Sequence, residues 1–161
     1  MSFATADLYD KYEDQLQIAT PIFNDYGGNI QFSGPASTVK VFAVNSLVRA
    51  ALEEAGDGRV LVVDGGGSLN CALLGDMLAD LGFKNGWVGV IVYGCIRDSA
   101  AIANMKIGVK ALNTNPKKSV KRGEGQRNVS VSFADVTIAP GNYIYADVDG
   151  IVISQNKLDL S

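Results

Sequence analysis

The sequence contains no histidine, and this absence excludes several kinds of site. Without histidine the chain cannot form a Ser-His-Asp triad, a Cys-His dyad or the usual zinc sites. It also lacks the side chain that most often serves as a general base near neutral pH. If the protein is an enzyme, its chemistry must therefore use carboxylates, arginine, lysine, backbone amides, water or a hard metal ion.

Cysteine and long apolar segments are also scarce. Cys71 and Cys95 have apolar neighbours and no Cys-x-x-Cys spacing, which favours small buried thiols in a cytoplasmic protein. No apolar run approaches the ~20 residues of a membrane-spanning helix. The N-terminal segment is acidic and lacks the apolar core of a signal peptide. These features predict a cytoplasmic protein without a membrane partner.

Basic charge is limited as well. The chain has 14 Lys and Arg against 17 Asp and Glu, a net charge of -3, which argues against direct contact with nucleic acid. The single basic cluster lacks the aromatic residues of a base-stacking surface, so we expect a solvated loop. Its members are Lys117, Lys118, Lys121, Arg122 and Arg127.

The length and hydrophobic content of the chain are sufficient for one hydrophobic core. With 161 residues, 47% of them hydrophobic, it is expected to form a single domain over residues 1–161. Apolar spacing and capping signals predict helices over 5–13, 46–55, 71–83 and 99–105. Apolar or alternating runs predict strands near 32 and over 38–42, 60–63, 87–93 and 107–112, and β-structure from 129 onward.

These elements indicate a mixed α/β domain. The middle of the chain follows a β-α-β-α-β order with buried parallel strands, and both flanks are predicted to be antiparallel β-structure. Locally, Thr5 is a candidate N-cap, residues 33–35 are expected to interrupt the strand near Phe32, and Gly75 marks a break or a new start within its helical stretch.

A glycine-rich turn follows the buried strand that ends in Asp64. Gly65, Gly66 and Gly67 could bring backbone amides to an anion, but the turn lacks the GxGxxG and GxxxxGK[ST] patterns of nucleotide-binding loops. A methyltransferase interpretation has the same weakness. We therefore expect these glycines to allow the close approach of a neighbouring segment or a small ligand. If the flanking strands are neighbours, this turn and Arg97-Asp98 should face one crevice.

A second glycine, Gly75, precedes Asp76 and an apolar helical run. This pattern predicts a helix start whose first amides, those of Asp76, Met77 and Leu78, have no partner within the helix. Such amides, together with the helix dipole, can bind a carboxylate or an enolate oxygen. In the alternative interpretation, Asp76 merely caps its own helix.

Asp76 is separated from Arg97 by twenty residues, and Asp98 follows at once. One helix and one strand fit between them, so the three side chains can meet at one edge of the sheet. Asp98 could ligate Mg²⁺ or Mn²⁺ through oxygen, with water in most other positions, and Arg97 could bind a carboxylate with two hydrogen bonds. Alternatively, Arg97 and Asp98 form a structural ion pair.

Strings spread over nearly the whole chain resemble one family, the regulator of ribonuclease activity A (RraA-like) family, which includes class II 4-hydroxy-4-methyl-2-oxoglutarate and 4-carboxy-4-hydroxy-2-oxoadipate aldolases. The strings are LYDKYEDQLQIATPIFNDYGG, FSGPASTVKVF, RVLVVDGGGS, YGCIRD, IGVKAL and YADVDGIVIS. The resemblance implies a swivelling β/β/α domain with a central mixed sheet, assembled as a homotrimer with sites near the subunit boundaries.

The D-x20-R-D signature of the aldolase members is intact here. By resemblance, Asp98 is the metal-ligating aspartate, and Arg97 contacts the pyruvyl carboxylate or keto oxygen and steadies the enolate. The segment Gly75, Asp76, Met77 and Leu78 resembles the helix start that binds substrate through its amides. Family aldolases are often longer, with a C-terminal segment that lends an acidic residue across a subunit boundary; this sequence ends at Ser161 without it.

The resemblance implies cleavage of a 2-oxo-4-hydroxy acid to pyruvate with Mg²⁺ or Mn²⁺, a water ordered by the metal as base, and oxaloacetate decarboxylation as a side activity. A Schiff-base aldolase would need a lysine in the pocket, and neither Lys40 nor Lys110 is marked as desolvated. The second hypothesis is that the protein is not an enzyme but a regulator that binds ribonuclease E. Such a regulator should tolerate the loss of the Asp98 carboxylate.

Overall fold

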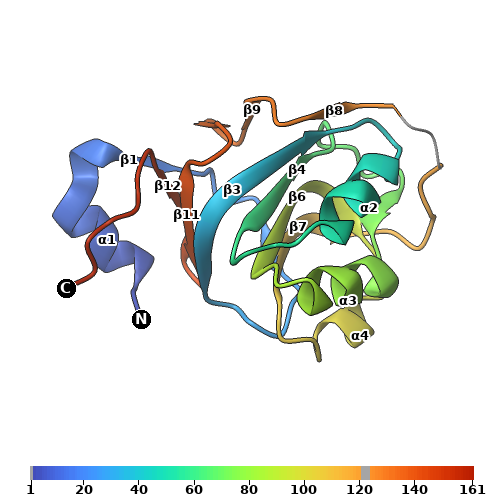
Figure 1. Ribbon diagram of the computed structural model, residues 1–161, viewed down its shortest axis with the longest axis horizontal. Coiled ribbons are helices and arrows are strands. Elements are labelled where there is room, and N and C mark those ends of the chain that lie inside the picture. Colours follow the sequence, from blue (N-terminus) through green and yellow to red (C-terminus); the bar gives the residue numbers. More distant parts are fainter. Residues whose placement is uncertain (1, 121–123) are drawn as a thin grey trace.

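The structure, a computed structural model, describes residues 2–120 and 124–161 (Figure 1). The helices are α1 (Thr5–Tyr12), α2 (Ser46–Glu53), α3 (Asp76–Lys84) and α4 (Ser99–Ile102), with a 3-10 turn at Glu13–Gln15. The strands are β1 (Leu16–Ile18), β2 (Asn24–Asp25), β3 (Phe32–Lys40), β4 (Val60–Asp64), β5 (Ala72–Leu74), β6 (Gly89–Ile96), β7 (Gly108–Thr114), β8 (Gln126–Arg127), β9 (Val131–Phe133), β10 (Val136–Ile138), β11 (Tyr143–Asp147) and β12 (Gly150–Ser154). Over these described ranges, none of the helices has both the length and the apolar character needed to cross a bilayer.

One large mixed sheet forms the centre of the molecule. Its strands follow the order β1-β12-β11-β3-β4-β6-β7-β2, with β5 beside β6 and β8 beside β3. Strands β3, β4, β6 and β7 are parallel neighbours, and β1, β2, β8, β11 and β12 pair antiparallel. The predicted mixed α/β class is therefore confirmed, with parallel strands in the middle of the chain and antiparallel strands on both flanks.

Strand β3 is continuous, although the sequence predicts an interruption at 33–35. The strand changes neighbours here: Pro35 lies opposite Tyr143 of β11, whereas pairing with β4 begins at Ala36. The Ala36 N–H donates to the carbonyl of Asn142 on the β11 side (2.8 Å). Because successive residues of a strand face opposite ways, the nitrogen of Pro35 points to the other side, before β4 pairing begins. Its missing N–H therefore removes no sheet hydrogen bond.

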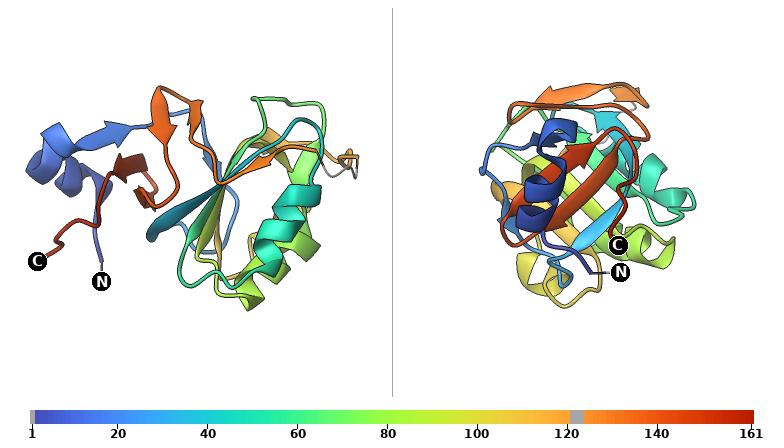
Figure 2. Two further views of the ribbon diagram at one scale, coloured as in Figure 1. Left: turned by 45° about the horizontal axis from the view of Figure 1, so that its top comes forward. Right: turned by 90° about the vertical axis from the view of Figure 1, so that its left-hand side faces the viewer.

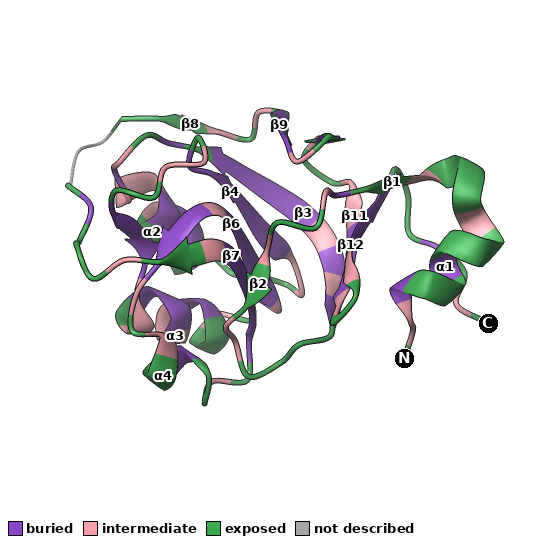
Figure 3. Cartoon of the chain, turned by 180° about the vertical axis from the view of Figure 1, so that it is seen from behind, coloured by how far each residue is buried: buried purple, intermediate pink, exposed green. Residues whose placement is uncertain are grey.

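Apolar side chains pack on both faces of the parallel strands, which explains why 60–63 is a continuous apolar run. On one face, Leu61 and Val63 pack under α2 and α3. On the other, Val60 and Val62 pack against residues of β9 to β12. Figure 2 shows α2, α3 and α4 on one side of the sheet and α1 apart from them, near β11 and β12, and Figure 3 shows the buried central strands in purple.

Helix α1 is held against the β11–β12 hairpin by a carboxylate. The N–H and the hydroxyl of Thr5 both donate to Asp147 at 2.7 Å, so Thr5 does not cap its own helix as predicted; Ala4 is the N-cap residue. Burial alone would raise the pKa of Asp147, but hydrogen bonds from Thr5, Asp149 and Gly150 outweigh it and lower the pKa.

We expect Asp147→Asn to lower the free energy of unfolding at pH 7 by about 1–3 kcal/mol, because the hydrogen bonds to a charged acceptor are weakened. A lowered folded-state pKa stabilises the fold above the unfolded value near 3.9. This contribution is complete above about pH 5 and disappears as the pH falls through the folded-state pKa. Urea unfolding at pH 7 and pH 3 should therefore show a smaller difference from wild type at pH 3. The exposed neighbour provides the control, Asp149→Asn, and an equal loss in both variants would contradict the assignment.

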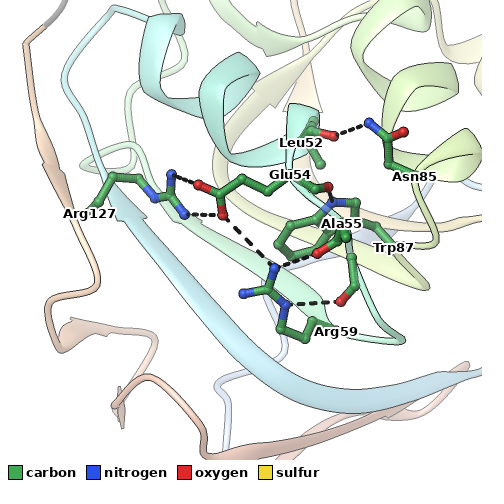
Figure 4. Close-up of polar contacts among 8 residues, drawn as sticks. Leu52, Glu54, Ala55, Arg59, Asn85, Trp87 and Arg127 are labelled. Carbon is green, nitrogen blue, oxygen red and sulfur yellow. Dashed lines mark hydrogen bonds and ion pairs between the residues drawn. The ribbon is translucent and has the colours of Figure 1, made fainter.

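A polar network anchors β8 to the loop after α2 (Figure 4). Arg127 pairs with both carboxylate oxygens of Glu54 at 3.2 and 3.3 Å, and the hydrogen bond from Arg127 lowers the pKa of Glu54. The guanidinium of Arg59 lies 4.5 Å from the ring centre of Trp87. Arg127 is therefore fixed by an ion pair and is not part of a solvated loop. Of the other basic residues in that cluster, Lys117 and Lys118 are exposed, and Lys121 and Arg122 lie outside the described residues.

Candidate functional site

The candidate site lies beyond the carboxyl ends of the parallel strands. Strand β4 ends where Asp64 pairs with Tyr93, while β6 continues to Ile96. The short strand β5 occupies the place beside these last residues, and Ala72 pairs with Cys95. Residues 72–74 are therefore a strand, and the prediction of a helix over 71–83 is wrong there; the helix begins only after Gly75.

Helix α3 begins at Asp76, with Gly75 as its N-cap residue. The backbone N–H of Asp76 donates to Oδ2 of Asp98 at 3.0 Å, so an aspartate from the end of β6 caps this helix. Asp76 does not cap its own helix, which removes that alternative. The N–H groups of Met77 and Leu78 donate to no acceptor among the described groups and remain available at the positive end of the helix dipole.

The backbone of Asp98 is left-handed, with φ 59° and ψ 38°. A non-glycine residue in this conformation carries strain, which Asp and Asn tolerate better than other residues. Gly75 lies against its carboxylate: a Cβ atom at this position would come within 2.8 Å of Asp98 Oδ2. Three features fix the position of the Asp98 carboxylate. They are the left-handed backbone conformation of Asp98, the hydrogen bond from the Asp76 N–H, and the lack of a Cβ atom at Gly75, which leaves room for Oδ2.

Arg97 is fixed at two points. Its N–H donates to the carbonyl of Leu74 (2.9 Å), and its Nη1 donates to the carbonyl of Pro116 (3.3 Å). Over residues 2–120 and 124–161, no ion pair joins Arg97 to Asp98 or to Asp76. The alternative of a structural ion pair is therefore wrong, and the remaining guanidinium N–H groups are available for a ligand.

These groups meet in one cavity of about 270 Å³. The structure brings together all six residues predicted from the sequence, namely Gly75, Asp76, Met77, Leu78, Arg97 and Asp98. Further described residues complete the lining, and the sequence argument missed them: Asn45, Ser46, Arg49, Ala72, Lys118 and Ser119. They come from the start of α2, from β5 and from the segment after β7, which carry no motif that would have identified them.

The glycine-rich turn after β4 does not line this cavity, although β4 and β6 are neighbours. A Cβ atom on Gly65 would lie 2.5 Å from a methyl carbon of Leu73 and 2.9 Å from the carbonyl of Tyr93. Oδ1 of Asp64 accepts the N–H of Gly66 at 2.9 Å. The expected close backbone approach is confirmed, and the occupant is a neighbouring segment of this chain.

The cavity offers the carboxylate oxygen ligands that a hard divalent cation prefers. Within the described ranges, no cluster of three or more His, Cys, Asp and Glu residues could enclose a metal ion. Asp76 and Asp98 nevertheless offer two carboxylates, and only Oδ2 of Asp98 is engaged by a hydrogen bond that the structure records. Mg²⁺ is typically bound by one or two carboxylates and several waters, so these residues fit such an ion.

The two lysines and two cysteines considered from the sequence, Lys40, Lys110, Cys71 and Cys95, do not line the cavity. Lys110 is buried, contrary to the expectation from sequence, but its ammonium pairs with Asp25 at 2.9 Å and donates to the carbonyl of Asp147. Lys118 does line the cavity, but it is exposed, whereas a Schiff-base lysine is activated by desolvation or by a neighbouring cation, so this mechanism is disfavoured. The prediction of buried free thiols at Cys71 and Cys95 is confirmed, and burial raises the pKa of Cys95.

Comparisons with known proteins place the chain in one family. The model of the RraA-like family (Aldolase/RraA) matches residues 5–153. A protein of Alkalilimnicola ehrlichii named "Putative 4-hydroxy-4-methyl-2-oxoglutarate aldolase" is 60% identical over 98% of both chains. Two solved structures superpose with a TM-score of 0.95. One, from Geobacillus kaustophilus, is described as S-adenosylmethionine:2-dimethylmenaquinone methyltransferase (52% identity; 97% of both chains). The other is the RNA-processing inhibitor RraA from Thermus thermophilis (41% identity; 99% of this chain and 97% of that one).

Proposed function

Because this chain belongs to the RraA-like family, we propose that it is a divalent-metal-dependent class II aldolase. Its substrates are 2-oxo-4-hydroxy acids of the 4-hydroxy-4-methyl-2-oxoglutarate type, which it cleaves to pyruvate. The observation that carries this proposal is the meeting of Asp76, Arg97 and Asp98 with the free amides of α3 in one cavity. The names of relatives such as the Alkalilimnicola ehrlichii protein support the same reaction.

The first step is binding of the 2-oxo acid end of the substrate. Arg97 can donate two hydrogen bonds to the carboxylate or one to the adjacent keto oxygen, since only Nη1 is engaged, with Pro116. Met77 and Leu78 line the same cavity, and their amides carry the partial positive charge of the helix start. These donors hold the 2-keto group where negative charge develops.

Bond cleavage then moves charge onto that oxygen. Removal of the C4 hydroxyl proton forms the C4 carbonyl, the C3–C4 bond breaks, and its electron pair gives the enolate of pyruvate. Arg97 and the α3 amides stabilise the enolate oxygen, and each well-placed donor contributes about 3 kcal/mol. The unpartnered carboxylate of Asp76 can orient the water that accepts the hydroxyl proton. Protonation of C3 completes pyruvate.

Asp98, with Asp76 beside it, would hold the divalent cation, for which we propose Mg²⁺ or Mn²⁺. When bound, the ion supplies Lewis-acid stabilisation of the developing negative charge. The Asp76 amide fixes Oδ2 of Asp98 and so orients the carboxylate toward the cavity. Oxaloacetate fits the same site, because loss of carbon dioxide leaves the same pyruvate enolate. We therefore propose oxaloacetate decarboxylation as a side activity.

The test is pyruvate release from 4-hydroxy-4-methyl-2-oxoglutarate and from oxaloacetate, coupled to lactate dehydrogenase. We expect turnover with added Mg²⁺ or Mn²⁺ and a loss of at least about 100-fold in excess EDTA, because the cation contributes several kcal/mol of charge stabilisation. Restoring the metal should restore the rate. Turnover that persists in EDTA would exclude the metal-dependent mechanism, and no turnover on either substrate would exclude the aldolase.

The methyltransferase description of the Geobacillus kaustophilus structure has less support in this chain. A methyl donor such as S-adenosylmethionine would need a cradle for its nucleoside. The glycine turn that could provide one is filled by Leu73 and Tyr93 and does not line the cavity. A cavity of about 270 Å³ suits a small acid better than a nucleoside cofactor.

A second candidate function rests on the structural match to the RNA-processing inhibitor RraA. A regulator of this kind would bind a ribonuclease such as ribonuclease E through its surface, as a homotrimer, and would contact no nucleic acid itself. The two functions are separable at Asp98, because loss of its carboxylate should stop pyruvate release and leave ribonuclease inhibition intact. Inhibition assays with purified ribonuclease E provide that comparison.

A further inference from the structure

A turn in the segment after β7 holds the carbonyl to which Arg97 is bound. Oδ1 of Asn115 accepts the N–H of Lys117 at 2.9 Å, which forms an Asx turn across Pro116. Nη1 of Arg97 donates to the carbonyl of Pro116 at 3.3 Å. Among the residues that the structure describes, this carbonyl is the one partner recorded for the Arg97 guanidinium. The turn is therefore the polar contact that restrains the guanidinium.

One peptide unit connects Asn115 to Arg97. The Pro116 carbonyl and the Lys117 N–H belong to the same planar peptide bond and point in opposite directions. Asn115 binds the N–H on one side, and Arg97 binds the carbonyl on the other. Because the ring of Pro116 fixes its φ angle, the carbonyl can turn mainly through ψ. The hydrogen bond from the Lys117 N–H to Asn115 restrains that rotation and with it the direction of the carbonyl.

Asn115 is itself held from two sides. Its Nδ2 donates to the carbonyl of Leu69 at 2.7 Å, and its backbone N–H donates to the carbonyl of Ile96 at 3.0 Å. Leu69 belongs to the loop that follows the glycine-rich turn, and the N–H of Gly65 ties that turn to the carbonyl of Tyr93 in β6 (3.0 Å). These bonds attach the Asx turn to β6 and to the loop before β5, although Asn115 does not line the cavity.

We propose that Asn115 is a positioning residue for Arg97, because it directs the Pro116 carbonyl that holds the guanidinium beside the substrate. This inference rests on the proposed function, in which Arg97 stabilises the enolate oxygen of pyruvate. A restrained guanidinium is in place before the enolate forms, whereas a free one must be ordered in each turnover. A displacement of about 1 Å can cost about 10²-fold in rate. Without the Asx turn, the carbonyl can rotate away from Arg97.

The test is Asn115→Ala, which removes both side-chain hydrogen bonds of the turn. We expect kcat for pyruvate release to fall about tenfold and KM to stay within about threefold of wild type, because the loss is greatest where charge develops. If the effect passes through Arg97, it should depend on the arginine. In an Arg97→Met background, Asn115→Ala should therefore change the rate by no more than about twofold. A merely structural role would give the same loss in both backgrounds.

A binding measurement repeats this comparison without turnover. Oxalate is a planar dianion whose adjacent oxygens have the arrangement of those in the enolate of pyruvate, so it serves as the probe. Calorimetry with Mg²⁺ present should show that Asn115→Ala weakens oxalate binding about fivefold, and that it has no further effect in the Arg97→Met background. This coupling in a protein that releases no pyruvate would support the positioning role and exclude the aldolase.

The matched control is Asn113→Ala, in the same segment. The recorded hydrogen bond of the Asn113 side chain is a local one, from the Thr114 N–H at 2.8 Å, and Asn113 does not line the cavity. This variant should keep the wild-type kcat, KM and oxalate affinity.

A conservative variant separates positioning from folding. Asn115→Asp keeps an acceptor for the Lys117 N–H, and aspartate is favoured in Asx turns, but the donor to Leu69 is lost. Its rate should therefore lie between those of wild type and Asn115→Ala. Because it keeps the turn, it also carries the comparison if the alanine variant has no folded melting transition. Wild-type kcat in folded Asn115→Ala, or equal losses in both Arg97 backgrounds, would overturn the proposal.

Discussion

Asp98→Asn is expected to reduce pyruvate release by at least about 10³-fold, with Mg²⁺ present. The carboxylate is the proposed metal ligand, and losing several kcal/mol of charge stabilisation corresponds to this factor at about 1.4 kcal/mol per tenfold. Asparagine keeps an oxygen that can accept the Asp76 N–H, and it tolerates the left-handed backbone of residue 98. The cap of α3 should therefore survive. The measurements are the coupled pyruvate assay and the melting temperature.

The matched control is Asp80→Asn, which removes an acidic residue of α3 that pairs with Lys84 outside the cavity. It should retain the wild-type rate. Pyruvate release by Asp98→Asn within about tenfold of wild type, in a folded protein, would exclude Asp98 as the metal ligand. A rate loss accompanied by a large drop in melting temperature would instead indicate a structural role for the carboxylate.

Arg97→Lys should lower kcat/KM for pyruvate release by about 10²–10³-fold. Lysine keeps the charge but cannot donate two parallel hydrogen bonds, so the developing enolate loses a positioned donor. The loss should lie mainly in kcat if Arg97 acts on the enolate, and in KM if it only binds the ground-state carboxylate. Initial rates over a range of substrate concentrations separate the two.

Lys117→Gln serves here as the control for removing a nearby exposed cation and should leave both constants unchanged. Arg97→Met provides the matched loss of charge. If Arg97→Lys and wild type release pyruvate at equal rates, the guanidinium has no part in the chemistry. In that event the amides of Met77 and Leu78 would be the remaining donors for the enolate.

Helices and strands could be predicted from the sequence wherever the apolar pattern of a segment reflects the burial of that segment alone. The apolar run at 60–63 is a parallel strand buried on both faces, as expected. The errors occur where tertiary pairing decides. Residues 72–74 form β5 because the end of β6 extends past β4 and is open on that side. Pro35 fits inside β3 because the strand changes partners at that point. Neither circumstance is visible in the local sequence.

The meeting of Asp76, Arg97 and Asp98 in one cavity was predicted because their spacing leaves room for one helix and one strand, which bring the chain back to the same edge of the sheet. The capping relation was not predicted: Asp98, rather than Asp76, caps α3. The other polar lining residues were missed because α2 and the segment after β7 meet only in the folded chain; they are Asn45, Arg49, Lys118 and Ser119. An arginine at position 49 has no unusual neighbours in sequence, and only its place in the cavity identifies it.

The shared strand β3 has a consequence for how the protein unfolds. Its first part pairs with β11 of the hairpin that holds α1, and its second part pairs with β4 of the layer that carries the cavity. Because one backbone serves both, neither layer can separate without breaking hydrogen bonds of the other. Amide protons in the middle of β3 should therefore exchange with solvent only during global opening, and the two apolar cores should melt as one cooperative unit.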